Sequence, residues 1–522
     1  MKVVILGGGI GGLSAAHILC SSNQDIEIHI YESDDIIGGQ ASSRMGKTCY
    51  VEYCWRVFFA TYTNIKSIIQ ELDAENNFEV LNYKLFDKDK VENLYLSKFL
   101  YDTMKEGKWD LFNNVIKLVC ECKPRLINEY DDISADDFFQ NDVFIRTFLG
   151  PYLGFDTTKV SLSSFLKFMF SMYDNRKENS ETGGSKVSTM PTQQALFEPW
   201  QRYLEKKGVH IHLSSNLTEI VYSQDEVKHV VVAGEKVTAD EYIFACPIKV
   251  MNRLLKPTCE TFAKMRHLES GLQLYYSMNL NLSKPLKPDK VNQFVLMDTP
   301  WYLVVDKKRA WKGGALANCN ANVKESWNIA AVDGIKGSLY DKVLSDCSKE
   351  EAQAEIMYQL QESAYLKKEK MAIVDIEDWP QFENDMNGKL TVTNPKFSVN
   401  VGNLKFMPST SQPDDIPKNM HLAAYYVNTT MGGVSMESSC ETGLQAGQKL
   451  LDDKNISHKR SVLKHNDNYL TFITLPLILI DYVLYHFKIA PLSKFLPPIF
   501  LLVLLFLLYG WIVFRAVVYF KT

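Results

Sequence analysis

Three glycines near the start of the chain have the residue type and spacing needed to hold the phosphates of a dinucleotide. Gly7, Gly9 and Gly12 form a G-x-G-x-x-G pattern directly after the apolar run 3–6. In this pattern the first glycine allows a tight turn, the second lets the backbone approach a pyrophosphate, and the third lets a helix pack on the sheet. The pyrophosphate then lies at the positive end of the helix dipole. We expect Gly7, Gly9, Gly11 and Gly12 to contact a cofactor.

An acidic residue follows where a ribose would be bound. The segment IEIHIYE predicts a second strand that ends at Glu32, twenty residues past Gly12. A carboxylate there accepts a hydrogen bond from a ribose 2′-hydroxyl and disfavours a ribose that carries a 2′-phosphate. Strand, glycine turn, helix and strand together open a βαβ unit. The first forty residues therefore predict a Rossmann-type dinucleotide site.

The residues after Glu32 favour FAD as the dinucleotide. The segment ESDDIIGGQASS places Gly38, Gly39 and Gln40 shortly after the acid. It resembles the second FAD contact loop of the flavin-containing amine oxidase and phytoene desaturase superfamily, which usually has a basic residue where Gln40 stands. Three further stretches resemble carotenoid desaturases of this superfamily in the same order: residues 51–72, the block from MPTQQALFEPW to IKVMNRLL, and NMHLAAYYVNTTMGGVSMESSCETGLQAGQKLL.

The resemblance implies particular contacts with FAD. It implies that the backbone of Leu217 contacts the adenine side, and that a helix beginning near Ser435 and Met436 points its N-terminus at the flavin pyrimidine ring. A helix N-terminus favours the negative charge of reduced flavin, so this placement makes chemical sense. By its position in WRVFF, Arg56 is expected beside the flavin, with a structural salt bridge as the equal alternative.

One position departs from the family pattern. The family usually has Gly-Asp where this chain has Ala424-Tyr425, and that Asp normally hydrogen-bonds the ribityl–pyrophosphate portion of FAD. The Tyr425 hydroxyl could replace part of this contact, FAD could bind less tightly, or activity could be lost. We include Tyr425 among the expected cofactor-binding residues.

The predicted fold class is α/β. It consists of a Rossmann-type FAD-binding domain, as in GR2-like flavoproteins, with an inserted α+β substrate domain and C-terminal transmembrane helices. Residues 60–180 are expected to be mostly helical, and residues 268–395 to combine aromatic-rich strands with a helix near 350–366. The expected FAD-binding parts are 1–80, 191–265 and 396–455, the substrate parts are 81–190 and 266–395, and 456–522 is expected to be a basic linker and membrane anchor.

The C-terminal residues suggest a membrane anchor. Residues 495–514 contain no charge over twenty positions, and a helix of that length crosses the ~30 Å hydrocarbon core. Residues 470–487 are also largely apolar and either span or lie in the interface. The basic stretch 458–465 suits anionic headgroups, with a solvated linker as the alternative. Because Met1 and Lys2 lead straight into the first strand without a signal peptide, we expect the catalytic domain to face the cytosol.

Composition excludes several other classes of function. The net charge of −5 offers no general attraction to nucleic acid. The ten cysteines show neither zinc spacing nor a disulfide framework, so we expect no metal site and a reducing compartment. Cys54 and Cys246 are expected to be buried free thiols. No defensible acid–base pair is present, so the catalytic residues are left unassigned.

These observations predict a membrane-anchored FAD-dependent oxidoreductase. The first hypothesis is desaturation or dehydrogenation of a lipid- or isoprenoid-like substrate by hydride transfer to flavin N5, with oxygen or a quinone as the electron acceptor. Amine oxidation and flavin-dependent isomerisation are alternatives within the same superfamily. A non-catalytic, FAD-stabilised membrane-tethered binding protein is a third possibility, because of the departure at Tyr425.

Overall fold

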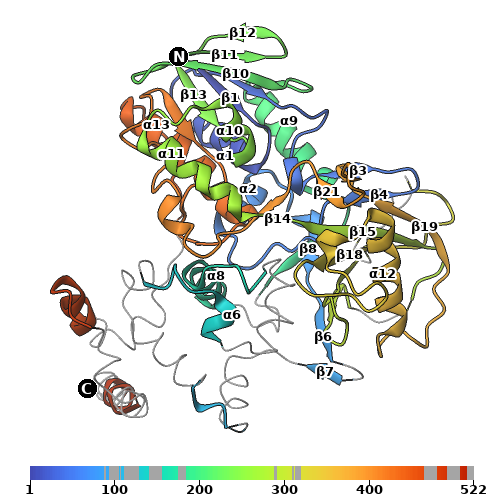
Figure 1. The fold of residues 1–522 in the computed structure, drawn as a ribbon. Helices are drawn as coiled ribbons and strands as arrows, with labels where there is room; N and C mark the ends of the chain where they lie inside the picture. Colours follow the sequence, from blue (N-terminus) through green and yellow to red (C-terminus); the bar gives the residue numbers. More distant parts are fainter. Residues whose placement is uncertain are drawn as a thin grey trace, which may run out of the picture.

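A computed structural model describes most of the 522-residue chain and shows two large sheets with their covering helices (Figure 1). All the helices and strands named belong to the described residues. These are 1–87, 90–92, 105, 107–110, 129–139, 156–174, 184–286, 291–308, 311, 319–463, 479–490 and 506–513.

A five-stranded parallel sheet is assembled from three separate stretches of the chain. Its order is β23 (Met420–Leu422), β13 (Glu241–Phe244), β1 (Lys2–Leu6), β2 (Glu27–Tyr31) and β9 (His210–His212). Val3 and Ile5 point into one core and Val4 and Leu6 into another, because successive side chains of a strand alternate between its faces. Both faces of the sheet are therefore buried, as is usual for parallel sheets.

Helices from both ends of the chain cover one face of this sheet. α1 (Ile10–Leu19) packs along α13 (Met436–Asp453), and α13 also contacts α2 (Thr63–Glu71). A Cβ on Gly443 would lie 2.0 Å from the carbonyl oxygen of Gly11, so the two helices meet at glycines. α9 (Glu198–Lys206) follows the π-helical turn η4 (Gln193–Phe197) and also contacts α1.

The opposite face of the sheet is covered by a second core. This core includes residues of β10 (Leu217–Tyr222), β11 (Val227–Val232), α10 (Ile248–Leu254) and α11 (Glu260–Met265). β12 (Glu235–Val237) pairs with β11.

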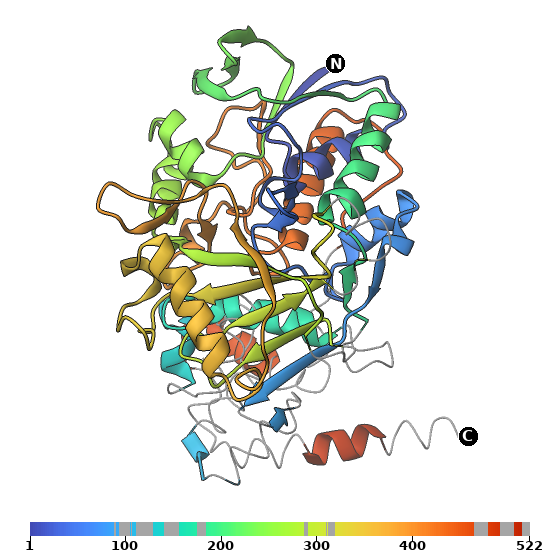
Figure 2. The ribbon, with the colours of Figure 1, turned by 90° about the vertical axis from the view of Figure 1, so that its right-hand side faces the viewer.

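The second sheet has seven strands, and α12 (Lys349–Glu362) lies against it (Figure 2). Ser348 and Glu351 form a capping box that starts this helix. The strand order is β19 (Ile373–Asp378), β15 (Tyr275–Leu282), β18 (Glu325–Val332), β17 (Val304–Lys307), β16 (Gln293–Leu296), β6 (Tyr83–Asp87) and β7 (Lys90–Glu92). The expected strands and helix within 268–395 are thus present.

The prediction that residues 60–180 are mostly helical is wrong for several segments. β6 pairs with β16, some two hundred residues later, and β5 (Phe78–Val80) pairs with β8 (Lys186–Ser188). Partners so distant in sequence override local helical spacing.

The remaining elements are η1 (Gly39–Ala41), β3 (Ser43–Met45), β4 (Tyr50–Glu52), η2 (Glu75–Asn77), α6 (Ala135–Phe138), α8 (Leu162–Asp174), η5 (Arg266–Gly271), β14 (Leu272–Gln273), η8 (Leu344–Asp346), β20 (Phe382–Asn384), β21 (Leu390–Val392), β22 (Lys396–Phe397) and η9 (Leu404–Phe406).

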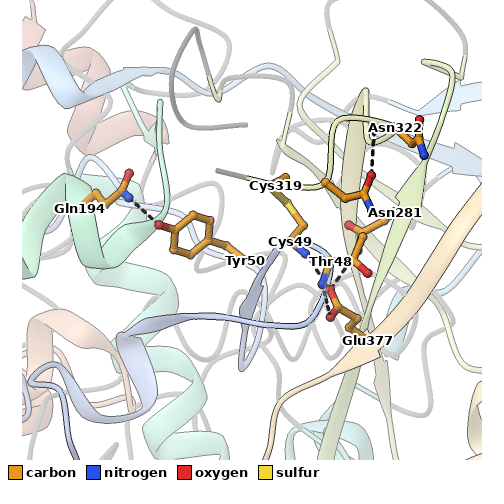
Figure 3. The surroundings of a disulfide bond; sticks show 9 residues. Thr48, Cys49, Tyr50, Gln194, Asn281, Cys319, Asn322 and Glu377 are labelled. Carbon is orange, nitrogen blue, oxygen red and sulfur yellow. Dashed lines mark hydrogen bonds between the residues drawn. A yellow bond between two sulfur atoms is a disulfide. The ribbon is translucent and has the colours of Figure 1, made fainter. Parts of the chain in front are cut away.

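The structure contains a disulfide that the scattered cysteines of the sequence did not indicate. Cys49 and Cys319 form a bond across 270 residues of sequence (Figure 3). The Glu377 carboxylate accepts hydrogen bonds from the backbone N–H groups of Thr48 and Cys49, at 2.8 and 3.0 Å, and so fixes the first of the two cysteines. Spacing in the sequence does not reveal a pair that only the fold brings together. The inference of a reducing compartment therefore loses its basis.

The proposed anchor lies largely outside the described residues. Of the two apolar segments, 470–478, 495–505 and residue 514 are not among them. In the part of the chain that the structure describes, no helix combines the length and apolar character needed to cross a membrane.

Candidate functional site

The glycine turn after β1 leaves an open space in front of α1. Gly7 has φ +110° and donates its N–H to the carbonyl oxygen of Tyr31 at 2.8 Å. Gly9 is the N-cap residue of α1, and a Cβ there would meet no atom of the described residues within 4 Å. The space beside Gly9 faces the positive end of a ten-residue helix, which is where a pyrophosphate is best stabilised.

The other two glycines of the turn serve packing. A Cβ on Gly12 would lie 1.9 Å from the carbonyl oxygen of Gly7, and one on Gly11 would lie 2.0 Å from that of Ala423. Any side chain at either position would therefore push α1 away from the sheet. These residues hold the helix in place while Gly9 borders the open space.

Glu32 stands at the carboxyl end of β2 beside the glycine turn. Its Oε2 accepts the N–H of Gly8 at 2.6 Å, and its Oε1 accepts the N–H of Asp34 at 2.9 Å. The residue is only 8% exposed, so its carboxylate is held in one orientation. The N–H of Ser215 binds the carbonyl oxygen of Glu32 at 2.7 Å, which brings the start of β10, at Leu217, to the same end of the site.

The second glycine loop lies directly against the first. Gly38 donates its N–H to the carbonyl oxygen of Gly8 at 2.8 Å and forms a parallel bridge with Gly9. Gly38 and Gly39 have φ values of +109° and +56°, which residues with a side chain rarely adopt. The structure thus brings the two predicted glycine loops and Glu32 together. Their geometry fits the ribose and pyrophosphate of a dinucleotide.

Arg56 and Gln40 form a small network behind this loop. The Nη2 of Arg56 donates to the carbonyl oxygen of Gln40, and the Nε2 of Gln40 donates to that of Asn394 at 2.6 Å. Arg56 is 9% exposed, and its Nε has no partner among the described residues. Within the described part of the chain its guanidinium donates to backbone carbonyls rather than to a carboxylate. Its positive charge also helps to lower the pKa of the buried Glu52 carboxylate, so the arrangement fits both expectations for Arg56.

Tyr425 lies at the edge of the site with part of its surface exposed. Its hydroxyl accepts the N–H of Ile248 at 3.2 Å, and its ring packs against Phe397 with 5.1 Å between ring centroids. Burial raises the pKa of Tyr425, so the hydroxyl stays protonated and keeps its hydrogen for a further acceptor. Tyr425 is therefore a packing residue whose neutral hydroxyl accepts one hydrogen bond from the backbone.

α13 begins close by with a well-formed cap. The hydroxyl of Ser435 accepts the N–H of Ser438 at 3.1 Å, and Met436 is the first helical residue. Glu437 is fully buried and accepts the N–H groups of Asn64 and Ile65 at 2.8 and 3.0 Å. Glu437 therefore caps α2 and joins the two helices.

Lys396 also belongs to this region, although it is not among the residues predicted from the sequence. Lys396 is half-buried, its Nζ lies 4.9 Å from the centroid of the Tyr275 ring, and burial lowers the pKa of its ammonium group. It follows Asn394 and Pro395, which accept from Gln40, and precedes Phe397, which packs on Tyr425. No sequence motif marks this lysine, because only the fold brings it to the glycine loop.

A buried ion cluster was also missed. The Nζ of Lys308 contacts Glu52 and lies 2.7 Å from the Oδ2 of Asp306, and the hydroxyl of Thr192 donates to Glu52 at 2.6 Å. Burial lowers the pKa of Lys308, but the two carboxylates outweigh it and raise the pKa above its usual range. Burial raises the pKa of Glu52, yet Lys308 and Arg56 bring it below its usual range. A cavity of about 10 Å³ beside the cluster has room for roughly one water.

The two cysteines singled out in the sequence are free and buried, as expected. Burial raises the pKa of Cys246 to about 12, and its thiol donates to the carbonyl oxygen of Leu6 at 3.3 Å. Burial also raises the pKa of Cys54. Neither thiol is reactive in this state. The aromatic residues Phe58, Phe59 and Tyr62 are likewise buried and belong to the core.

Comparison with known proteins identifies a family and several relatives to which the sequence of this chain is similar. Residues 10–451 match the family described as flavin containing amine oxidoreductase. The chain is 24% identical over 298 residues to zeta-carotene desaturase of Zea mays, covering 49% of this chain and 51% of that protein. It is 25% identical over 297 residues to a probable zeta-carotene desaturase of Synechococcus elongatus, covering 49% and 60%. The chain thus spans between half and three fifths of the length of these relatives.

Solved structures of low sequence identity share the fold. Putrescine oxidase bound to putrescine has a TM-score of 0.60 at 14% identity, covering 87% of this chain and 99% of that one. Cyclohexylamine oxidase from Brevibacterium oxydans has a TM-score of 0.60 at 13% identity, with the same coverage. The predicted α/β fold of FAD-binding type is therefore confirmed.

Proposed function

We propose that this protein is an FAD-dependent oxidoreductase, because the chain belongs to the family described as flavin containing amine oxidoreductase. The observation that carries this proposal is the open space at Gly9, bounded by the start of α1, the second glycine loop and the Glu32 carboxylate. When bound there, FAD supplies the acceptor for an electron pair taken from the substrate.

The residues of this chain have separate roles in the proposal. The turn at Gly7 and Gly9 and the start of α1 hold the pyrophosphate, while Glu32 accepts from the adenosine ribose and the backbone of Leu217 contacts the adenine side. Gly38, Gly39, Gln40 and Arg56 fix the second loop, and the start of α13 at Ser435 and Met436 stabilises the negative charge that reduction brings. The division of the chain into FAD-binding, substrate and anchor segments belongs to the same proposal.

We further propose an apolar, isoprenoid-like substrate, with oxygen or a quinone as the final acceptor. The similarity to zeta-carotene desaturases supports this class of substrate. Aromatic side chains also lie beside the second loop: the indole N–H of Trp55 donates to the Tyr275 hydroxyl at 2.6 Å, and Lys396 lies over the Tyr275 ring. Such side chains exclude water from the place where a C–H bond is broken.

Anaerobic mixing with candidate substrates tests the reaction class. An apolar polyene should bleach the flavin absorbance, and diamines or cyclic amines should not. Bleaching by amines alone would establish amine oxidation instead. A flavin that no compound of either class bleaches would support a binding protein without turnover.

Tyr425→Phe should weaken FAD binding by about 0.5–1.5 kcal/mol, the usual net value of one neutral hydrogen bond. The reason is that Tyr425 still has a hydroxyl hydrogen to donate, although Ile248 occupies an acceptor position. Equilibrium titration of apoprotein with FAD measures the change. Restoring the family pair with Ala424→Gly and Tyr425→Asp should leave affinity equal or higher. If the phenylalanine variant binds FAD normally while the double variant loses it, Tyr425 only packs.

We also propose that the apolar residues 470–487 and 495–514 anchor the protein in a membrane. Apolar segments of this length are stable in the hydrocarbon core, so the full-length protein should stay in the membrane fraction in high salt and leave it only with detergent. A chain shortened after Asp467 should be released and still bind FAD, because the glycine loops, Tyr425 and α13 all precede it. Release of the full-length protein by salt alone would contradict the anchor.

A further inference from the structure

A polar cleft lies at the far end of α1 from the glycine turn. It encloses about 570 Å³, and its lining includes Ser21, Ser67, Lys207, Lys459, Arg460 and Ser461. Because α1 has ten residues, the cleft is about 15 Å from Gly9 along the helix axis. It is therefore a site separate from the proposed FAD site, and its volume is that of a small-molecule pocket.

The charges that line the cleft favour an anion. Arg460 forms an ion pair with Glu71, which neutralises the acidic residue of the lining. Lys207 and Lys459 are exposed and add two positive charges. Burial lowers the pKa of the neighbouring His17, which keeps that ring neutral. The net charge of the lining is therefore about two positive units.

The guanidinium of Arg460 also belongs to the lining of the cleft. It is 9% exposed, its Nη2 donates weakly to the carbonyl oxygen of Asn64 at 3.4 Å, and its Nε has no partner among the described residues. Because this Nε–H is shielded from solvent, Arg460 acts on an anion in the cleft through its positive charge rather than by a hydrogen bond from Nε.

The end of α1 does not oppose an anion. Its last carbonyl oxygens would repel negative charge if they were bare. However, the carbonyl oxygen of Ile18 accepts both the N–H and the hydroxyl of Ser21, at 2.9 and 2.7 Å, and that of Leu19 accepts the N–H of Ser22 at 3.2 Å. The helix end is thus covered by donors of its own loop.

Backbone hydrogen bonds hold the segment that carries Lys459 and Arg460 in place. Lys459 donates its N–H to the carbonyl oxygen of Ser21 at 3.2 Å, and Leu463 donates its N–H to the side chain of Asn64 at 2.9 Å. The segment 459–463 is therefore hydrogen-bonded to the end of α1 and to α2, although the Lys459 side chain remains exposed. Preorganised charges bind an anion better than charges on a flexible tail, because less ordering is needed on binding.

We propose that this cleft binds a phosphate-bearing anion. Two ammonium groups, a guanidinium and the hydroxyls of Ser67 and Ser461 form a set of donors suited to phosphate oxygens. The cleft is larger than a phosphate alone and has room for a polar group of glycerol size. This chemistry is shared by the headgroup of an anionic phospholipid and by a soluble phosphate ester. The segment 459–463 leads within a few residues to the apolar segment that begins at 470.

Calorimetric titration of the full-length protein in neutral detergent tests the site. The probes are glycerol 3-phosphate, dihexanoyl phosphatidic acid and dihexanoyl phosphatidylcholine. We expect saturable binding of a phosphate monoester and at least about a tenfold loss of affinity in Lys207→Glu with Lys459→Glu. Lys228→Glu with Lys236→Glu, which changes the charge equally on β11 and β12, should bind within about twofold of the wild type. Lys207→Gln with Lys459→Gln should lose less affinity than the glutamate pair.

The probes also identify the source of the phosphate. Tighter binding of phosphatidic acid than of glycerol 3-phosphate would identify a lipid headgroup, and equal binding would identify a soluble ester. Absence of saturable binding for both, or equal binding by the cleft variant and the wild type, would overturn the proposal. An unchanged flavin spectrum in each variant verifies that the protein remains folded. A negative binding result for the cleft does not contradict the proposed FAD site, because the two sites are separate.

Discussion

Gly9→Val should deprive the protein of FAD while leaving it folded. A Cβ at Gly9 meets no protein atom within 4 Å, and the φ of −74° is one that valine adopts, so the substitution causes no clash within the described residues. The branched side chain would instead fill the place of the pyrophosphate. We expect FAD affinity to fall at least about 100-fold, or ~2.8 kcal/mol. Flavin absorbance per chain and circular dichroism measure cofactor and fold separately.

Gly12→Val is the matched control at the same turn. A side chain there meets the carbonyl oxygen of Gly7 at 1.9 Å, so this variant should lose its fold together with its flavin. The contrast between the two glycines is the diagnostic result. Normal FAD retention by Gly9→Val would contradict the placement of the pyrophosphate beside Gly9.

Lys308→Met should destabilise the fold by about 3–5 kcal/mol, the usual effect of removing one partner of a buried ion pair. The substitution leaves Glu52 and Asp306 buried without a cation in contact, and both are at most 3% exposed. Urea unfolding followed by tryptophan fluorescence gives the change in midpoint.

Lys342→Met provides the comparison for this substitution. Lys342 pairs with Glu351 at 2.7 Å, but both side chains are partly exposed, so its loss should change stability by less than about 1 kcal/mol. Equal effects of the two substitutions would show that the Lys308 cluster does not stabilise the fold.

The parts of the site that could be predicted from the sequence are formed by residues that lie close together in the chain. Gly7, Gly9 and Glu32 lie within one βαβ unit, where the spacing of the strand, turn and helix already fixes their relative positions. The cap of α13 at Ser435 is local as well, since Ser435 and Ser438 satisfy each other's backbone groups. Such features follow from a few neighbouring residues.

The features that sequence missed depend on contacts across the chain. Lys308 meets Glu52 across more than 250 residues, and Cys49 meets Cys319 across 270. Lys396 reaches the second glycine loop only because Asn394 accepts from Gln40. No periodicity or motif carries these pairings. They follow from the strand order of the two sheets, which a single sequence does not specify.

The most direct test of the proposed function is to identify the cofactor of the purified full-length protein. Protein extracted in detergent should be yellow and, on denaturation, release about one FAD per chain, with no FMN. This result follows from a site that holds both a pyrophosphate at Gly9 and a ribose at Glu32. A colourless protein that takes up no added FAD, or one that releases FMN, would contradict the central claim.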